Sequence, residues 1–217
     1  MPKQTFFNLP SEKRALIIEA AIEEFAVHGF QKASINKIVD KASIAKGSVY
    51  QYFENKEELY SYLVESASGK KLAYINKELE TASDDFFQIY KRIIFLSARF
   101  DLEHTLYSCF LYSVGKDAHN LNMAKRIMSS SIDYVKQLLR EAQNKGQIRS
   151  DVNLDLAAFL IGYLSVDVGE YIGQKYGFSY PDVLKSKAEN LPVTDAQLHE
   201  VLDELVDFFK RGISLIH

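Results

Sequence analysis

The stretch from Lys41 to Leu59, which reads KASIAKGSVYQYFENKEEL, limits the possible folds of this chain more than any other. Around its start, four apolar residues recur at spacings of three, one and three, which is typical of one face of a short helix: Ile35, Ile38, Val39 and Ala42. The pattern breaks at Ser43, and Val49 and Phe53 then indicate the buried face of a second short helix over residues 46–53. Two short helices joined by so tight a turn predict a helix-turn-helix.

The remaining face of the second helix carries groups suited to DNA. Hydroxyl, amide and ammonium groups bond to base edges and phosphates in the major groove. With two residues of the preceding helix, the predicted DNA contacts are Ser34, Lys37, Lys46, Gly47, Ser48, Tyr50, Gln51 and Tyr52. Gly47 breaks a local rule, because glycine inside a helix costs about 0.5–1 kcal/mol relative to alanine. We interpret it as a point where the backbone approaches DNA closely, and a frayed surface turn is the alternative.

A third helix is predicted to begin directly afterwards. Asn55 is placed to cap it, and Glu58 is placed to reach back to the cap backbone as in a capping box. Lys56 then lies at the N-terminal end, where a cation opposes the helix dipole. A phosphate bound at that helix end would explain the lysine, so Lys56 joins the predicted DNA contacts. Ser34 is the predicted N-cap of the first helix of the motif.

These residues resemble the DNA-binding domain of the TetR/AcrR family of bacterial transcriptional regulators. The resemblance runs from about Lys13 to Leu63, through AAIEEFAVHGF, ASINKIVDKASIAKGSVYQYF and NKEEL. Two positions depart from the family pattern: Ser43 stands where a turn glycine is usual, and Ala45 where a serine N-cap is frequent. The resemblance implies a DNA-binding regulator whose C-terminal helices four to eight enclose an effector pocket.

The composition agrees with an intracellular protein, and the distribution of charge, though not the net charge, favours DNA binding. The 217 residues are 47% hydrophobic, enough for one or two domains, and contain a single cysteine, Cys109. No uninterrupted apolar run of membrane-spanning length and no signal-peptide core is present, so we expect no membrane association and a cytoplasmic protein, nucleoid-associated when bound to DNA. The net charge is −3, yet residues 32–56 hold five lysines against two acids, a net +3 that leaves −6 for the remainder. A basic patch on an acidic body is typical of a DNA reader with a separate second half.

Helical periodicity without strand signals predicts an all-α fold. We expect an N-terminal three-helix DNA-binding domain over residues 1–54 and a six-helix effector-binding and dimerisation domain over residues 55–217. The predicted helices span residues 11–28, 35–42, 46–53, 55–79, 84–99, 102–113, 122–144, 153–176 and 194–217. The sequence leaves open whether Phe6 and Phe7 pack on the domain or belong to a flexible arm.

Aromatic residues are frequent in the middle of the second predicted domain. The candidate pocket residues among them are Phe95, Phe100, Tyr107, Phe110, Tyr134 and Tyr163. An apolar lining with a few hydroxyl groups would suit a small hydrophobic or aromatic effector. Ordinary core packing is the alternative for each of them.

The last two predicted helices carry wide apolar stripes. The residues assigned to a homodimer interface are Phe159, Tyr163, Leu198, Val201, Leu202, Leu205 and Phe209. Two such helices can form a symmetric four-helix interface with a second copy, although packing within their own domain also explains a stripe. A symmetric dimer of DNA readers requires a palindromic operator.

No catalytic or metal-binding pattern is found in the sequence, so we expect neither an enzyme nor a bound metal or cofactor. The five histidines are scattered, and His104 lies about 140° around a helix from Cys109, which does not place a nucleophile beside its base. Three hypotheses remain. The first is a dimeric repressor released from DNA by a small effector, the second a DNA-bound adaptor of the same fold that binds a protein partner instead, and the third an all-α enzyme with a degenerate helix-turn-helix.

Overall fold

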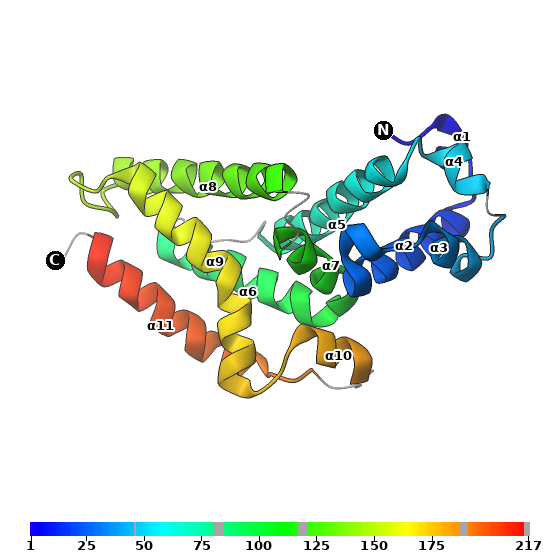
Figure 1. The fold of residues 1–217 in the computed structure, drawn as a ribbon. Coiled ribbons are helices and arrows are strands. Elements are labelled where there is room, and N and C mark those ends of the chain that lie inside the picture. Colours follow the sequence, from blue (N-terminus) through cyan, green and yellow to red (C-terminus); the bar gives the residue numbers. More distant parts are fainter. Residues whose placement is uncertain (46, 80–84, 117–120, 187–190, 215–217) are drawn as a thin grey trace. The chain divides into compact units, whose positions relative to one another are not determined.

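The computed structural model describes the chain except for residues 46, 80–84, 117–120, 187–190 and 215–217. The described residues form helices throughout, with one isolated backbone bridge between Ile148 and Ser214 (Figure 1). The helices are α1 Gln4–Phe7, α2 Ser11–Lys32, α3 Ile35–Lys41, α4 Ser48–Tyr52, α5 Lys56–Leu79, α6 Phe86–Glu103, α7 Thr105–Lys116, α8 Leu121–Asn144, α9 Leu154–Tyr176, α10 Tyr180–Ser186 and α11 Asp195–Ile213. The prediction of an all-α fold is confirmed.

The chain packs into two compact units. Unit 1 contains Met1–Leu72 and Leu106–Leu121, and unit 2 contains Ala73–Thr105 and Asn122–His217. Helix α5 and the chain around α7 therefore contribute to both packing units. The domain boundary predicted between residues 54 and 55 stays a prediction.

The core of unit 1 forms where α2, α3, α4 and the first turns of α5 present their apolar faces to one another. Phe25 of α2 lies parallel to Phe30, with ring centroids 6.3 Å apart. Tyr60 of α5 meets Phe25 edge-on at 4.9 Å and Phe110 of α7 at 5.4 Å. These aromatic rings are buried, and they fix α5 and α7 against the long helix α2.

Unit 2 is built around the contact of α6 with α11. The apolar stripe of α11 is buried there, as is most of one face of α6. Tyr90 of α6 shares a hydrogen bond of 2.8 Å with Ser165 of α9, and burial raises the pKa of Tyr90 to about 12. Arg99 of α6 bonds both Glu103 and the first residue of α11, Asp195. This packing holds α6, α9 and α11 together as one helical layer.

Several helix limits follow the capping signals of the sequence, while α6 runs to Glu103, four residues beyond its predicted end. Gly146 and Gly177 follow the last turns of α8 and α9 with positive φ angles of 72° and 75°, a conformation that glycine adopts without strain. Gly29, with φ 66°, kinks α2 at the point where the sequence predicted the helix to end. Helix α7 runs through Gly115, where the sequence predicted its end. The short helices α1 and α10 were not predicted, because four and seven residues are too few to show a helical period.

Candidate DNA-binding site

The helix-turn-helix is present, and Ser43 carries its turn. Ser43 has a φ of 52°, in the left-handed region. Its N–H donates to the carbonyl of Asp40 at 3.2 Å, and the Ile44 N–H donates to that of Val39 at 3.0 Å. A side chain in this conformation costs about 1–2 kcal/mol, which glycine would avoid. The predicted turn therefore forms, and Ser43 adopts a backbone conformation that is strained for serine but not for glycine.

Helix α4 is anchored by the residues predicted to anchor it. Val49 and Phe53 are buried, while Tyr50 is 53% exposed and Gln51 is exposed. Ser48 is half-buried. The exposed side chains near this helix thus offer hydroxyl and amide groups to a ligand, as a major-groove helix requires.

Two of the predicted contacts on this helix need correction. Tyr52 is only 7% exposed and lies 6.0 Å from the ring of Phe6, so it belongs to the core and does not face a groove. Gly47 is the N-cap residue, with φ −76° and ψ −12°, so the helix-interior cost assigned to it does not apply. Nothing lies within 4 Å of the place where a Cβ would stand at Gly47, so the protein itself does not require glycine there. Lys46 lies outside the described residues.

Helix α3 is held by a glutamate that the sequence argument missed. Ser34 occupies the predicted N-cap position, but its side chain makes no capping bond. Instead the Ser34 N–H donates to Oε1 of Glu24 at 2.9 Å. The second carboxylate oxygen of Glu24 lies 3.6 Å from Nε2 of His28. No local signal marks Glu24, because it lies ten residues before its partner.

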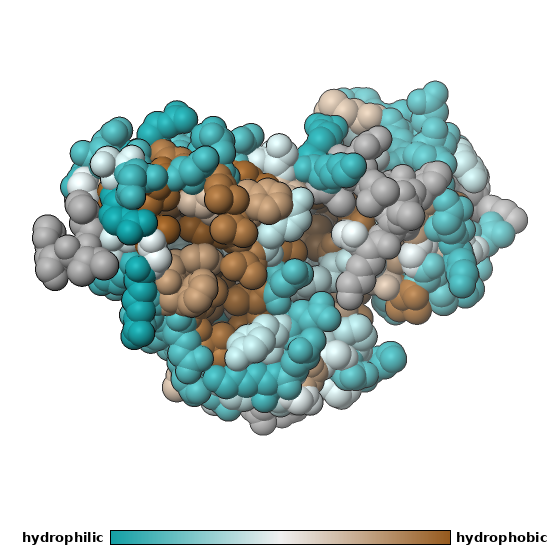
Figure 2. All heavy atoms as spheres, turned by 60° about the vertical axis from the view of Figure 1, so that its left-hand side comes forward, coloured by the Kyte–Doolittle hydropathy of each residue, from teal (hydrophilic) through white to brown (hydrophobic). Residues whose placement is uncertain are grey.

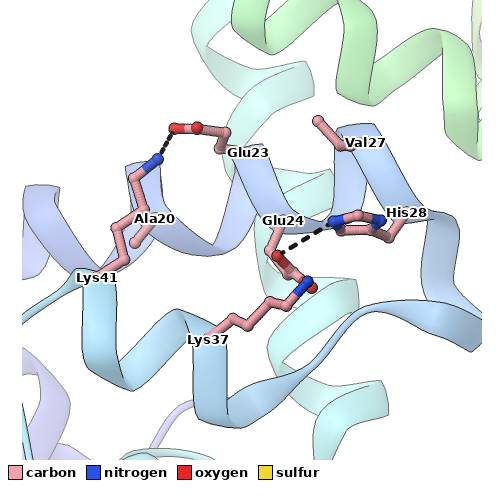
Figure 3. Close-up of a pocket in the computed structure, with 7 residues that line it drawn as sticks. All are labelled: Ala20, Glu23, Glu24, Val27, His28, Lys37 and Lys41. Atoms are coloured by element: carbon pink, nitrogen blue, oxygen red, sulfur yellow. Dashed lines mark ion pairs between the residues drawn. The ribbon is translucent and has the colours of Figure 1, made fainter.

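A small cavity of about 290 Å³ lies between α2 and α3 (Figure 3). It is lined by Ala20, Glu23, Glu24, Val27, His28, Lys37 and Lys41. Lys41 forms an ion pair with Glu23 across it, and Lys37 points toward Glu24 in the same view. The lining carries both signs of charge, and the ion pair of Lys41 with Glu23 links α3 to α2.

Lys56 has a structural role that the sequence did not reveal. Its Nζ donates to the carbonyl of Ala33 at 2.7 Å and to that of Gln31 at 3.3 Å. The same ammonium lies 5.0 Å from the ring centroid of Phe30. Carbonyls at the C-terminal end of a helix lack partners within the helix, and a cation there is favourable. The cation therefore stabilises the end of α2, although it opposes the dipole of its own helix α5.

The start of α5 forms nearly as predicted. The Glu58 N–H donates to Oδ1 of Asn55 at 2.8 Å. The Glu58 carboxylate accepts from the Glu54 N–H at 2.7 Å, one residue before the predicted cap. Its other oxygen bonds the amino group of Met1, and these two hydrogen bonds lower the pKa of the Glu58 carboxyl.

The N-terminal segment packs on α4, which settles the question about Phe6 and Phe7. Phe6 is fully buried, with its ring centroid 4.9 Å from that of Phe53, and Phe7 is 40% exposed. Arg14 of α2 donates to the carbonyls of Phe7 and Leu9 at 2.6 and 2.7 Å. The segment is therefore part of unit 1.

The six predicted pocket residues are divided between the two units. Tyr107 and Phe110 belong to unit 1, where Phe110 is fully buried against Tyr60. Phe95 and Phe100 are buried in unit 2, and Phe95 stacks on His199 at 4.4 Å. The remaining two, Tyr134 and Tyr163, are nearly half exposed. Aromatic character alone could not separate core from pocket, because both environments favour the same residues.

The residues predicted for a dimer interface also separate into two groups. Leu198, Val201, Leu202 and Phe209 are buried within unit 2, and Leu205 is half-buried. The four buried side chains pack within unit 2, so they are not exposed to a second copy. Phe159 and Tyr163 of α9, by contrast, are 49% and 46% exposed.

Apolar side chains gather on the surface of unit 2 (Figure 2). On α9 the large exposed ones are Leu156, Phe159, Leu160, Tyr163, Leu164, Val166 and Tyr171. By length and composition α9 could cross a membrane, and 39% of its most apolar window is buried. Most of these side chains recur every three to four residues, so they form one face, and such a face marks an interaction site.

Comparison with known proteins identifies the family. A family model described as bacterial regulatory proteins, tetR family, matches residues 17–63. The probable acrEF/envCD operon repressor of Escherichia coli is 25% identical over 156 residues, covering 68% of this chain and 70% of that protein. A crystal structure of a TetR family transcriptional regulator from Chloroflexus aurantiacus matches all of both chains with a TM-score of 0.80 and 26% identity. This chain belongs to the TetR family.

One further relative and one further solved structure have names that concern fatty acid metabolism or an acyl-CoA. The fatty acid metabolism regulator protein of Bacillus subtilis is 26% identical over 154 residues, covering 67% of this chain and 75% of that protein. The structure of the transcriptional regulator FadR from Bacillus subtilis in complex with stearoyl-CoA matches 88% of this chain and 97% of its own, with a TM-score of 0.68 and 18% identity. The resemblance found in the sequence is confirmed, and the chain is a TetR-family transcriptional regulator.

The position of the Lys56 ammonium predicts a loss of stability on its removal. Lys56→Met leaves the carbonyls of Ala33 and Gln31 without this donor, so we expect the free energy of unfolding to fall by about 1–3 kcal/mol. Thermal and urea unfolding followed by circular dichroism would measure it. Lys13→Met, at an exposed position of α2, is the control and should change stability by under about 0.5 kcal/mol. Equal stability of the two variants would contradict the structural role of Lys56.

Proposed function

We propose that this TetR-family regulator is a homodimeric repressor that binds a palindromic operator through α4 and is released by a small hydrophobic or aromatic effector. The observation that carries the proposal is the division of α4 into two faces. Val49, Tyr52 and Phe53 anchor it in the core, and Tyr50 and Gln51 are exposed. A side chain fixed on an anchored helix can read base edges at a defined position. The protein would act in the cytoplasm, at the nucleoid.

Positive charge near α4 also supports DNA binding by this part of unit 1. Lys32 and Lys37 are exposed, and Lys46 lies two residues before the start of α4 in the sequence. Such cations attract the phosphate backbone, and phosphate contacts fix the register of a reader without specifying sequence. The Lys56 ammonium has bonds within the protein, which supports its role as a structural residue more than its proposed phosphate contact.

The exposed apolar face of α9 supports a homodimer. Phe159 and Leu160 lie on one turn of α9 and Leu164 on the next, each is close to half exposed, and Phe208 of α11 is 71% exposed. A second copy of α9 would cover them in a symmetric contact. Two α4 helices in such a dimer can enter successive major grooves when they stand ~34 Å apart, so the operator would be a palindrome with half-sites one helical turn, or a multiple of it, apart.

The loose burial of α8 supports an effector site in unit 2. Its apolar residues from 127 onward recur at helical spacing, yet only Leu139 and Ala142 are buried. Ile127 and Tyr134 are exposed, and Ile132 and Val135 are half-buried. A hydrophobic molecule could bury more of this face. Because two relatives regulate fatty acid metabolism or bind stearoyl-CoA, acyl-CoA thioesters are the first effectors to test.

The exposed apolar side chains of α8 and α9 also fit the adaptor hypothesis. A protein partner could cover the exposed side chains of α8 or α9 in place of a small molecule. The two functions differ in what releases the DNA, so a linkage experiment separates them. The enzyme hypothesis has the least support, because the relatives reported above are named as regulators.

Base readout by α4 predicts a position-specific effect of Gln51. Gln51→Ala should cost ~1–3 kcal/mol of binding at one or two base pairs and leave non-specific affinity nearly unchanged. Selection of binding sites from random duplexes, followed by titrations with single base changes, would measure it. Gln137→Ala on α8 is the matched control and should bind every duplex as the wild type does. A uniform loss across all duplexes would contradict base readout by Gln51.

The dimer proposal predicts a concentration-dependent dissociation. Phe159→Glu removes an apolar ring from each copy and adds a charge, so dimerisation should weaken at least ~100-fold, from about 1.5–3 kcal/mol per buried ring. Sedimentation velocity over a dilution series would follow it. Leu72→Glu changes an apolar residue of α5 that is 58% exposed, and it should leave the dimer intact. A monomeric wild type at micromolar concentration would overturn the proposal.

Effector release predicts reciprocal binding affinities. An effector that prefers the DNA-free form ~100-fold supplies about 2.7 kcal/mol per site, and the operator must weaken effector binding by the same factor. Acyl-CoA thioesters of increasing chain length would be titrated by calorimetry with and without the selected operator. Equal affinities in the two titrations would reject acyl-CoA release. Release by a protein partner but by none of a wider panel of small molecules would favour the adaptor.

A further inference from the structure

Helix α4 is too short to satisfy its own carbonyl groups. It contains five residues, and the chain leaves the helical conformation at Phe53, with φ −128° and ψ 147°. The Phe53 N–H closes the last turn on the Val49 carbonyl at 2.7 Å. The carbonyls of Tyr50, Gln51 and Tyr52 would need N–H groups of the next turn, which does not exist. Such carbonyls bond either to water or to donors from elsewhere in the chain.

The N-terminal segment, residues 1–8, supplies those donors. The Lys3 N–H donates to the Tyr52 carbonyl at 2.8 Å, and the Lys3 ammonium donates to the Tyr50 carbonyl at 2.9 Å. The Thr5 hydroxyl donates to the Gln51 carbonyl at 2.5 Å. Three consecutive carbonyls at the C-terminal end of α4 are therefore each bound by this one segment.

The segment is itself fixed at both of its sides. Phe6 is fully buried, and its ring lies 4.9 Å from that of Phe53 and 5.4 Å from that of Tyr62. Arg14 of α2 holds the carbonyls of Phe7 and Leu9. The three donors thus stand on a segment bound to α2 and α5, and the contact links α4 to parts of unit 1 that are distant in sequence.

We propose that Lys3 and Thr5 are positioning residues for DNA recognition, which hold the C-terminal end of α4 so that Tyr50 and Gln51 meet base edges in one orientation. The inference rests on the proposed function, in which α4 reads DNA. Thr5 acts through the backbone of Gln51 and need not touch the duplex. Loss of its hydroxyl lets the end of α4 move, and base discrimination falls before general DNA affinity does.

The matched pair Thr5→Val and Thr5→Ser tests this role in the full-length protein. Valine has nearly the shape of threonine without a hydroxyl, and serine keeps the hydroxyl. Thr5→Val should lower affinity for the selected operator about three- to tenfold, the range of one hydrogen bond, and leave affinity for unrelated duplex DNA unchanged. Thr5→Ser should restore the operator affinity of the wild type. Melting temperatures of all three proteins report whether the fold is intact.

Hydrogen exchange of the DNA-free protein measures the positioning itself. In Thr5→Val the Phe53 amide should exchange faster than in the wild type, because the turn that it closes is released, while Thr5→Ser should match the wild type. Lys3→Met, which removes the bond to the Tyr50 carbonyl, should act in the same direction.

Three outcomes would contradict the positioning role or the proposed function. Wild-type operator affinity and wild-type exchange in Thr5→Val would overturn the positioning role while leaving the proposed function intact. A loss shared equally by operator and unrelated DNA, or matched by a fall in melting temperature, would also overturn it. If Gln51→Ala leaves base preference unchanged but Thr5→Val speeds exchange at Phe53, then α4 does not read DNA through Gln51, and the proposed function fails instead.

Discussion

The candidate recognition helix has little stability of its own, and the rest of unit 1 is arranged around that constraint. Five residues close a single helical turn, so α4 depends on side chains and backbone from other elements. Val49 and Phe53 bury one face of it. The turn at Ser43 sets its start, and the N-terminal segment binds the carbonyls at its end. A helix held in this way keeps its exposed side chains fixed, which base recognition requires.

The lysines around the motif divide between two tasks. Lys41 pairs with Glu23, and Lys56 bonds the carbonyls that end α2. Lys32 and Lys37 are exposed and available to phosphates. The net positive charge of this stretch therefore overstates what DNA would meet, because part of it stabilises the protein. The sequence shows how many cations a stretch contains, but it does not show which of them are already paired within the protein.

The two long helices at the end of the chain carry similar stripes and have different roles. The stripe of α11 packs on α6 and is buried, whereas α9 leaves a row of large apolar side chains exposed. Helix α11 begins with a complete capping box at Thr194 and is tied to α6 through Arg99 and Asp195. It belongs to the core of unit 2, which leaves the face of α9 as the surface suited to a second copy.

The sequence by itself determined the features that depend on neighbouring residues. The all-α fold, the helix-turn-helix, the burial of Val49 and Phe53 and the helix end before Gly146 all follow from spacings of a few residues. The glycine signal at Gly29 marks a kink in α2, which runs on to Lys32.

Only the tertiary structure decided the features that join distant parts of the chain. The ammonium of Lys56 reaches Ala33, the hydroxyl of Thr5 reaches Gln51, and Tyr52 is buried beside Phe6. The stripe of α11 is likewise buried within its own unit, while much of α9 is not. Helical periodicity says which residues share a face. It cannot say which partner covers that face, because the partner is chosen by packing over the whole unit.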